Sequence, residues 1–285
     1  MQRRKYKNND NLSIIGLGGI SIKGLGKTKA SEIISFSIDN GINYFDVAPG
    51  YGDAQELMGV GLLPYRKDVF LACKTKFRDL RNSQSDLENS LKLLKTNYFD
   101  LYQLHGMKTL DDFEKVTSKN GALKTLIEAK EKGLIRYLGF SCHSIKVAKL
   151  LINLSIFDSI LFPVNWNLMI KENFGEEILK LCEEKNITVL ALKSMAERKW
   201  KENENRLYKN CWYKPINDPF LMDLSIKFTL SKNVTSLIPP GDQGLYKKSI
   251  EIGKNYKKLS KSEYEYLCNL SPSNNPIGNV DEIFI

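Results

Sequence analysis

Short hydrophobic runs alternate along the chain with longer segments in which apolar residues recur every three or four positions. Runs rich in β-branched and aromatic residues are typical of buried parallel strands, and the wider spacing is typical of amphipathic helices. Strands are predicted at residues 14–18, 42–47, 69–74, 99–105, 135–140, 160–164, 188–192 and 235–239. Helices are predicted at residues 31–40, 83–96, 123–132, 145–154, 174–185, 218–231 and 245–255.

The number and order of these elements favour one architecture. Eight strands alternating with helices are typical of an α/β protein with a closed (β/α)8 TIM barrel, because an open sheet usually has fewer strands. Residues 3–13 are predicted to form an N-terminal hairpin that closes the bottom of the barrel. We therefore expect residues 1–285 to form a single domain, interrupted by a long polar connection at residues 193–215.

Local signals mark where some of these helices begin and end. Gly41 and Gly133 each follow a predicted helix, where glycine readily ends a helix in the left-handed conformation. Ser83, with Asp86 three residues later, predicts a capping box at the start of the second helix.

Composition and charge then narrow the class of protein. The 285 residues carry a net charge of +9, but the lysines are scattered. The basic cluster Arg3-Arg4-Lys5 lacks the interleaved aromatics of a single-strand binder, so we expect neither a nucleic-acid nor a membrane partner. Five cysteines without a C-x-x-C pattern argue against a disulfide framework or a metal site, and they indicate a cytoplasmic protein.

Four polar residues fall at or just after the ends of neighbouring predicted strands: Asp46, Tyr51, Lys74 and His105. The carboxyl ends of barrel strands converge on one mouth, so these side chains are expected to meet. Reduction of a carbonyl needs a proton donor, and a free tyrosine, with a pKa of about 10, is a weak acid. A nearby lysine cation lowers the pKa of a tyrosine, an aspartate keeps the lysine charged, and a histidine can orient the carbonyl oxygen.

Three segments resemble the aldo-keto reductase superfamily. Residues 41–52, Gly-Ile-Asn-Tyr-Phe-Asp-Val-Ala-Pro-Gly-Tyr-Gly, are similar to its first signature, and residues 87–94 and 98–105 are similar to its capped helix and its histidine-ended strand. The resemblance implies an NAD(P)H-dependent oxidoreductase that reduces an aldehyde or ketone to an alcohol. It implies Tyr51 as the general acid, with Asp46, Lys74 and His105 in the roles given above.

The same resemblance implies a set of cofactor contacts: Ser141, Asn165, Lys193, Pro239 and Gly241. Ser141 corresponds to a residue at the nicotinamide carboxamide, Lys193 to the pyrophosphate segment, and Pro239 and Gly241 to the adenosine-phosphate loop. Lys247 and Lys248 are the candidates to hold a 2′-phosphate, because the usual basic positions are occupied by Pro240 and Tyr246. NADP is therefore favoured as cofactor, and NAD is the alternative.

Three positions depart from the pattern of the superfamily. Cys142 stands where Asn is common, Leu161 replaces the Gln that binds the carboxamide, and Val164 replaces the Tyr that stacks on nicotinamide. These departures keep open a non-enzymatic, nicotinamide-binding regulatory protein, and a lyase or isomerase acting on phosphorylated compounds is a further alternative. The substrate is expected to be a small carbonyl compound, walled by Trp166, Trp200, Trp212, Tyr213 and the tail at residues 275–285.

Overall fold

The computed structural model describes residues 1–270, in which eight parallel strands form one sheet. In spatial order they are β3 (Leu17–Gly18), β4 (Tyr44–Asp46), β5 (Phe70–Thr75), β6 (Phe99–Met107), β7 (Ile135–Cys142), β8 (Ser159–Pro163), β9 (Thr188–Leu192) and β12 (Ser236–Ile238). A parallel bridge between Ile15 and Leu237 joins the two edges of the sheet, and the Gly16 amide donates to the Leu237 carbonyl at 2.9 Å. The predicted (β/α)8 barrel is therefore confirmed.

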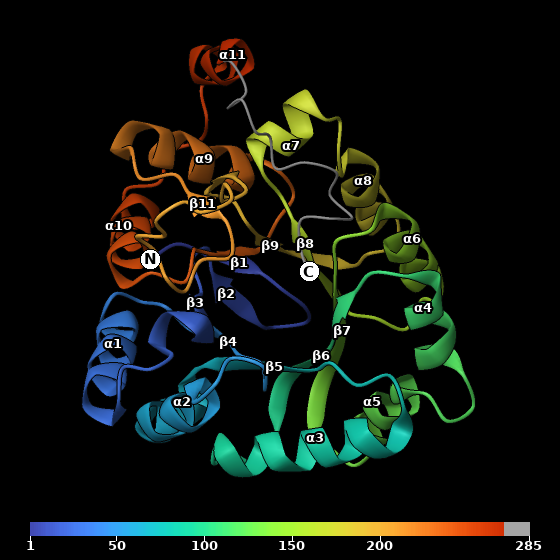
Figure 1. Cartoon of the computed structure of the whole chain (residues 1–285). Helices are drawn as coiled ribbons and strands as arrows, with labels where there is room; N and C mark the ends of the chain where they lie inside the picture. The colour runs from blue at the N-terminus through green and yellow to red at the C-terminus, as the bar shows by residue number, and fades with distance from the viewer. Residues whose placement is uncertain (271–285) are drawn as a thin grey trace.

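Helices surround the strands on all sides (Figure 1). They are α1 (Lys27–Asp39), α2 (Ala54–Leu62), α3 (Leu80–Leu93), α4 (Leu110–Thr117), α5 (Ala122–Glu131), α6 (Ile145–Asn153), α7 (Trp166–Lys171), α8 (Glu176–Glu184), α9 (Pro219–Ser231), α10 (Gln243–Lys254) and α11 (Lys261–Asn269), with 3-10 turns η1 (Gly19–Ile22) and η2 (Leu63–Asp68). All the predicted helices are present, whereas α2, α4, α7 and α11 were not predicted. Gly41 and Gly133 follow α1 and α5 with φ angles of 80° and 71°, as expected for C-terminal caps.

The predicted capping box at Ser83 is wrong. α3 begins at Leu80, and the carboxylate of Asp79 accepts a hydrogen bond from the Asn82 amide at 2.9 Å. Ser83 lies within the first turns, where its hydroxyl donates to the Leu80 carbonyl at 3.0 Å. The first turns are polar apart from Leu80, and a serine with an acidic residue three positions later imitates a helix start inside them.

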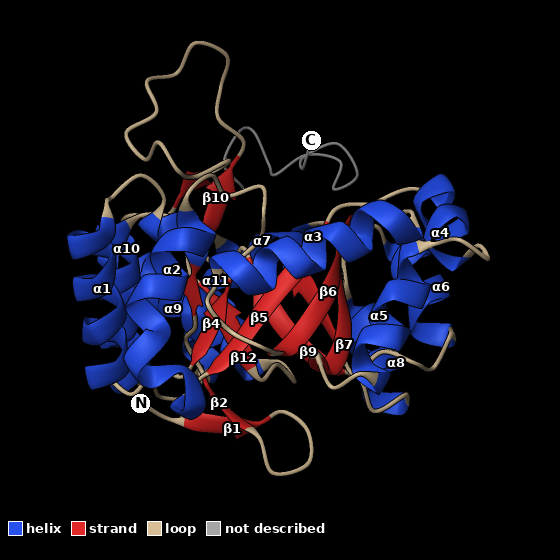
Figure 2. Cartoon of the chain, turned by 90° about the horizontal axis from the view of Figure 1, so that it is seen from below, coloured by secondary structure: helices blue, strands red, loops and turns tan. Residues whose placement is uncertain are grey.

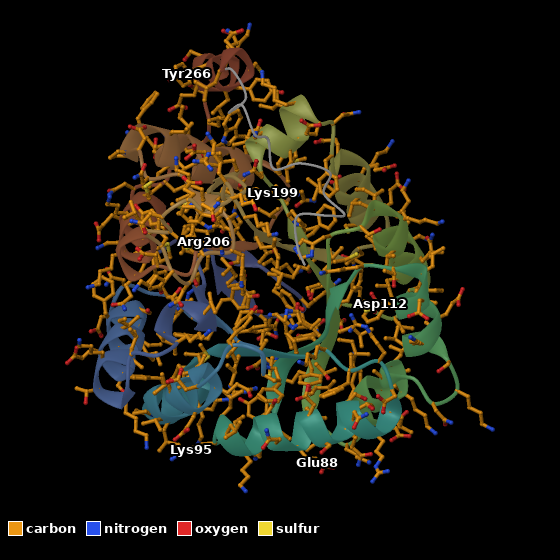
Figure 3. The ribbon with its side chains drawn as sticks, viewed as in Figure 1. Glu88, Lys95, Asp112, Lys199, Arg206 and Tyr266 are labelled. Carbon is orange, nitrogen blue, oxygen red and sulfur yellow. The ribbon has the colours of Figure 1, made fainter. Side chains whose placement is uncertain are left out.

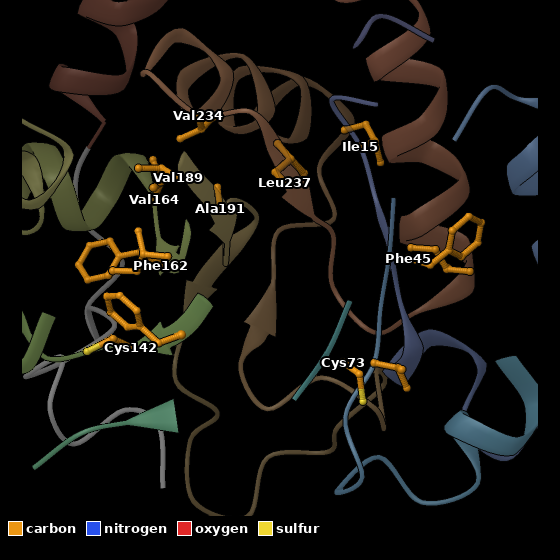
Figure 4. Packing of buried hydrophobic residues seen from close by; sticks show 14 of the residues in the cluster. Ile15, Phe45, Cys73, Cys142, Phe162, Val164, Val189, Ala191, Val234 and Leu237 are labelled. Atoms are coloured by element: carbon orange, nitrogen blue, oxygen red, sulfur yellow. The ribbon is translucent and has the colours of Figure 1, made fainter. Parts of the chain in front are cut away.

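Apolar side chains form two layers, one inside the barrel and one between the strands and the helices. Tyr44 and Ala72 belong to the inner cluster, whereas Phe45 and Cys73 belong to the outer one. Figure 4 shows part of the outer layer, with Phe45, Phe162 and Val189 among its members. Successive strand residues point to opposite faces, so Asp46 and Lys74 share the inner face with Tyr44 and Ala72.

A hairpin of β1 (Arg3–Lys5) and β2 (Asn11–Ser13) closes one end of the barrel, as predicted, and lies opposite β10 (Figure 2). The Tyr6 hydroxyl donates to Ser159 Oγ at 2.8 Å. Arg4 donates to the Val234 carbonyl at 2.7 Å, so part of the basic N-terminal cluster has a structural role. Because the hairpin covers this end, a ligand site is expected at the opposite end of the barrel.

The connection at residues 193–215 contains a second hairpin, formed by β10 (Ala196–Arg198) and β11 (Lys214–Pro215). Its loop projects away from the barrel (Figure 2). The Arg198 guanidinium binds the Glu204 carboxylate at 2.7 Å, and Trp200 Nε1 donates to the Cys211 carbonyl at 2.9 Å. These bonds give the loop a defined shape.

None of the helices within residues 1–270 combines the length and the apolar character needed to cross a membrane.

Candidate active site

A cavity of about 590 Å³ lies at the carboxyl ends of the strands. Asp46, Tyr51, Lys74 and His105 all line it, so the structure brings the four candidate catalytic residues together. Ligand sites in proteins typically occupy about 300–1,000 Å³, and in barrels of this kind they lie at this end.

Asp46 and Lys74 form a buried ion pair on the inner face of β4 and β5. Lys74 Nζ donates to Asp46 Oδ1, and Lys74 is only 1% exposed. The other carboxylate oxygen, Oδ2, accepts from the Gln103 amide at 3.1 Å and from the Tyr44 hydroxyl at 3.2 Å. Removing charges from water is costly unless they are paired and hydrogen-bonded, and here neighbouring strands supply the partners.

Tyr51 is placed by the loop between β4 and α2. Its amide donates to the Ala48 carbonyl at 3.1 Å, and Gly52, with a φ angle of 62°, turns the chain directly afterwards. The Tyr51 ring lies 6.0 Å from the His105 ring and 5.9 Å from the Trp212 ring, measured between centroids. The proton donor candidate is thus flanked by an imidazole and an indole.

The expectation that a lysine lowers the pKa of Tyr51 is not supported. Burial raises the pKa of Tyr51, and the negative charge of Asp46 raises it further. The physical reason is that Asp46 is ion-paired with Lys74, which offsets the lysine's positive field at the phenol. Tyr51 therefore keeps its proton at neutral pH, as a proton donor must.

His105 ends the inward-facing part of β6. Arg78 donates to its carbonyl at 3.0 Å, and the amide of the next residue, Gly106, donates to Ser141 Oγ at 2.7 Å. Burial lowers the pKa of His105 to about 3, and the positive charges of Lys74 and Arg78 add to this effect. The imidazole is therefore neutral at ordinary pH and can donate one hydrogen bond while uncharged.

Comparison with known proteins relates this geometry to a family. The model of the aldo/keto reductase family matches residues 14–218, well over half of the chain. The chain belongs to the aldo/keto reductase family.

Two relatives of this aldo/keto reductase family member come from Bacillus subtilis. The uncharacterized oxidoreductase YqkF is 33% identical over 206 residues, and the aldo-keto reductase YhdN is 30% identical over 194 residues. These matches cover 67% and 63% of this chain, but only 64% and 56% of the two relatives. The chain thus matches less than two thirds of the length of either relative.

Solved structures of the family show the same fold. The holo form of an aldo-keto reductase from Bacillus halodurans superposes with a TM-score of 0.73 at 23% identity, covering 97% of this chain and 99% of that chain. An aldo/keto reductase from Brucella melitensis gives a TM-score of 0.68 at 18% identity, covering 95% and 99%.

Lys193 is the most unusual residue on the other side of this reductase-family cavity. It lines the cavity although it is only 7% exposed, and its φ angle is 65°. A side chain in the left-handed region costs roughly 1–2 kcal/mol, and such strain tends to gather at functional sites. Burial lowers the pKa of Lys193 well below its usual value, and Lys108 lowers it further.

The remaining cofactor candidates divide into two groups. Ser141, Pro239 and Gly241 line the cavity together with Lys193. Asn165, Lys247 and Lys248 are not among the residues that line it.

The side chain of Asn165 forms its hydrogen bonds with backbone groups of the protein. Its side chain accepts from the Asn167 amide at 2.9 Å, capping α7, and donates to the carbonyls of Lys193 and Ala196, each at 2.9 Å. It therefore holds the backbone around Lys193 in place, so it is a positioning residue and not a lining one.

Lys247 and Lys248 are exposed on α10, and Lys247 Nζ lies 5.4 Å above the ring of Phe36. Between them and the loop at Gly241, the carboxylate of Asp242 caps α10 by accepting from the Leu245 amide at 3.0 Å. The start of α10 therefore already has an anionic cap.

Val164, which stands where the superfamily has a stacking tyrosine, does not line the cavity. Val164 is fully buried and belongs to the outer apolar cluster, whereas Leu161 and Leu192 line the cavity. Val164 directly follows β8 and packs toward the helices, so it does not line the cavity.

Of the expected aromatic walls, Trp212 and Tyr213 line the cavity. Trp166 is 4% exposed and packs in the apolar core, and Trp200 instead fastens the loop through its bond to Cys211. The tail at residues 275–285 lies outside the described residues.

Several residues that line the cavity were not predicted: Lys76, Arg78, Lys108, His143 and Arg206. Two of them had a signal in the sequence, because Lys76 and Lys108 follow Lys74 and His105 by two and three residues. Arg206 comes from the long loop, whose path no local pattern reveals. Within residues 1–270, no three His, Cys, Asp or Glu side chains gather to hold a metal ion.

Proposed function

We propose that this protein is an NAD(P)H-dependent oxidoreductase that reduces an aldehyde or ketone to an alcohol, with Tyr51 as the general acid. One observation carries the proposal: Tyr51 and His105 face the same cavity as the buried Asp46–Lys74 pair and the buried side chain of Lys193. The candidates for acid, orienting group and pyrophosphate-binding group thus line one cavity.

The residues present are compatible with a nicotinamide dinucleotide. Lys193 would hold the pyrophosphate, because a phosphate anion beside its buried Nζ would favour the protonated, charged form of the lysine. Ser141 Oγ accepts from Gly106, so its own proton can be donated to a carboxamide oxygen. Leu161 offers no hydrogen bond at the wall of the cavity, so Ser141 would supply more of the hydrogen bonding to the carboxamide. The bound dinucleotide would supply a hydride to the carbonyl carbon.

Tyr51 would deliver the proton to the carbonyl oxygen as negative charge develops there. An alkoxide is about as basic as hydroxide, whose conjugate acid, water, has a pKa of about 15.7. Even a phenol with a raised pKa can protonate such an oxygen, and at neutral pH it is fully loaded with its proton. Neutral His105 would donate a hydrogen bond to the same oxygen and fix its position.

Asp46 and Lys74 would stabilise the phenolate that Tyr51 becomes after transfer. Before proton transfer the charges of Asp46 and Lys74 offset each other in their ion pair, and the charge of Asp46 disfavours ionisation of Tyr51. Once the phenolate forms, we expect the positive charge of the Lys74 ammonium to stabilise it, because an opposite charge a few ångströms away favours the ionised form.

A fluorescence titration of the purified protein with NADPH and, separately, NADH tests the cofactor half of this proposal. We expect saturable binding of at least one of them, weakened about tenfold in Lys193→Ala through loss of a charged hydrogen bond. Lys199→Ala, on the same loop but outside the cavity lining, is the matched control.

The same titration decides between the two cofactors. NADPH is favoured by the sequence, whereas NADH would be favoured by Asp242, because a carboxylate can bond a ribose hydroxyl but repels a 2′-phosphate. Binding without carbonyl-dependent oxidation of the bound dinucleotide would support the regulatory, non-enzymatic alternative. No binding of either would overturn the proposal.

A further inference from the structure

Asp46 is a carboxylate buried inside the barrel. Acidic side chains such as Glu88 on α3 and Asp112 on α4 lie instead on the helices around it (Figure 3). Asp46 is 3% exposed, so groups of the protein must stabilise its charge in place of water. The nature of these groups therefore affects the chemistry proposed for the site.

The two oxygens of the Asp46 carboxylate have partners of different kinds. Oδ1 accepts from the ammonium of Lys74 on β5. Oδ2 accepts from two uncharged side chains, the amide of Gln103 on β6 at 3.1 Å and the hydroxyl of Tyr44 on β4 at 3.2 Å. Gln103 and Tyr44 are completely buried and are not among the residues that line the cavity. They can therefore act on a bound ligand only through Asp46.

Another buried carboxylate of this chain is stabilised in a different way. Asp100 on β6 is 2% exposed and binds two guanidinium groups, Arg66 at 3.0 Å and Arg136 at 2.7 Å. Two cations thus hold Asp100, whereas one cation and two neutral donors hold Asp46. A carboxylate with neutral donors keeps part of its stabilisation when its cation is attracted by another anion.

The side chain of Gln103 is useful at one end and costly at the other. Its oxygen, Oε1, is buried and has no hydrogen-bond partner within the described chain, which costs free energy. Gln103 pairs with Lys74 in the register of β5 and β6, so its nitrogen lies beside the ion pair and donates to Asp46. The favourable contact of this amide is therefore its bond to Asp46.

The proposed proton transfer changes the charges around Asp46. When Tyr51 becomes a phenolate, the ammonium of Lys74 is attracted by two anions instead of one. The charge of Asp46 opposes this ionisation, because it raises the pKa of Tyr51. Each hydrogen bond to Oδ2 stabilises the carboxylate independently of Lys74, so it lowers the cost of sharing the ammonium with the phenolate.

We propose that Gln103 and Tyr44 are positioning residues for the proton transfer. They hold the carboxylate of Asp46, so that Lys74 can turn part of its charge toward the phenolate of Tyr51. This inference rests on the proposed reductase function. Because the two residues touch neither substrate nor cofactor, their loss should slow the chemical step and leave binding unchanged.

Variants that remove only the donor test this role. We expect Tyr44→Phe and Gln103→Leu each to lower the single-turnover rate of NADPH oxidation by 4-nitrobenzaldehyde about tenfold, the value of one hydrogen bond to a charged group. The Kd of NADPH should stay within about twofold of wild type, as for a loss confined to the transition state. Tyr6→Phe is the matched control: it also removes a buried hydroxyl bond, to Ser159 at 2.8 Å, but at the closed end of the barrel, and it should keep the wild-type rate.

A double-mutant cycle separates this role from a purely structural one. In Asp46→Asn the carboxylate charge is gone, so adding Gln103→Leu should change the rate by less than about twofold. If Asp46→Asn does not fold, Asp46→Asn/Lys74→Met, which leaves no unpaired charge, is the background instead. Equal losses with and without the carboxylate, or wild-type rates in Tyr44→Phe and Gln103→Leu, would overturn the inference.

Urea unfolding of the same proteins distinguishes failure of this inference from failure of the reductase function. If Gln103→Leu and Asp46→Asn are coupled in the free energy of unfolding but not in the rate, the bond between them has only a structural role. The inference would then be wrong, and the reductase function would stand. If wild type oxidises neither NADPH nor NADH with any of a panel of aldehydes and ketones, the reductase function is overturned, and this inference with it.

Discussion

The two walls of the cavity are built in different ways. On the catalytic wall, Asp46, Lys74 and His105 lie on the consecutive strands β4, β5 and β6, and Asp46 accepts hydrogen bonds from side chains of β5 and β6. On the cofactor wall, Lys193 lies just beyond the end of β9 in a strained conformation, and Asn165 holds its carbonyl from a distance of 28 residues in sequence. Strand geometry thus positions the proposed catalytic residues, whereas a loop and a side-chain clamp position Lys193 on the proposed cofactor wall.

The largest effect is expected from Lys74→Met. Loss of the ammonium should lower kcat by about 10²–10⁴-fold, the usual contribution of acid–base machinery. It should also lower the free energy of unfolding by about 3–5 kcal/mol, because the carboxylate of Asp46 would be left buried without its cation. Steady-state kinetics and urea unfolding measure the two losses.

A double variant sharpens this result. In Asp46→Asn/Lys74→Met no unpaired charge remains, so much of the lost stability should return while kcat stays low. If activity returned together with stability, the ion pair would have only a structural role, and the assignment of Asp46 and Lys74 to a catalytic wall would be wrong.

A smaller effect concerns acid stability and His105. The pKa of His105 is about 3 in the folded chain and about 6.5 when unfolded, so the unfolded state binds more protons between these values. Stability from this group is therefore lost as pH falls below about 6.5. Between pH 7 and 5, wild type should lose on the order of 1–2 kcal/mol more than His105→Gln, as measured by urea unfolding at each pH. Equal losses in both proteins would mean that His105 is not held neutral by its surroundings.

The strands and the catalytic wall could be predicted because both depend on local rules. Short apolar runs located all eight strands, and residues directly at strand ends, such as Lys74 and His105, meet at one mouth whatever the loops do. Burial of Lys74 in an apolar run required a nearby acid, and Asp46 lies on the adjacent strand.

The cofactor wall could not be predicted in the same way. A shift of one residue along a strand reverses the face, so Val164 was compared with a stacking residue although it points outward. Asn165 can equally cap a helix or bind a ligand, and only its contacts distinguish the two roles. Lys247 and Lys248 lie near the adenosine-phosphate loop in sequence, but α10 carries them away from the cavity. Trp212 is 62% exposed and still contacts Tyr51, a proximity set by the path of the long loop.

We propose that Tyr51 supplies the proton while other residues hold the cofactor, and a paired measurement on Tyr51→Phe separates these two roles. Carbonyl-dependent turnover and the Kd of the preferred dinucleotide would be measured on the same preparation, with Tyr65→Phe, whose hydroxyl lies at Ser35 outside the cavity lining, as the control. We expect Tyr51→Phe to lose about 10²–10⁴-fold in kcat while its Kd stays within about twofold of wild type. Turnover close to that of wild type in Tyr51→Phe, with the cofactor bound, would contradict it.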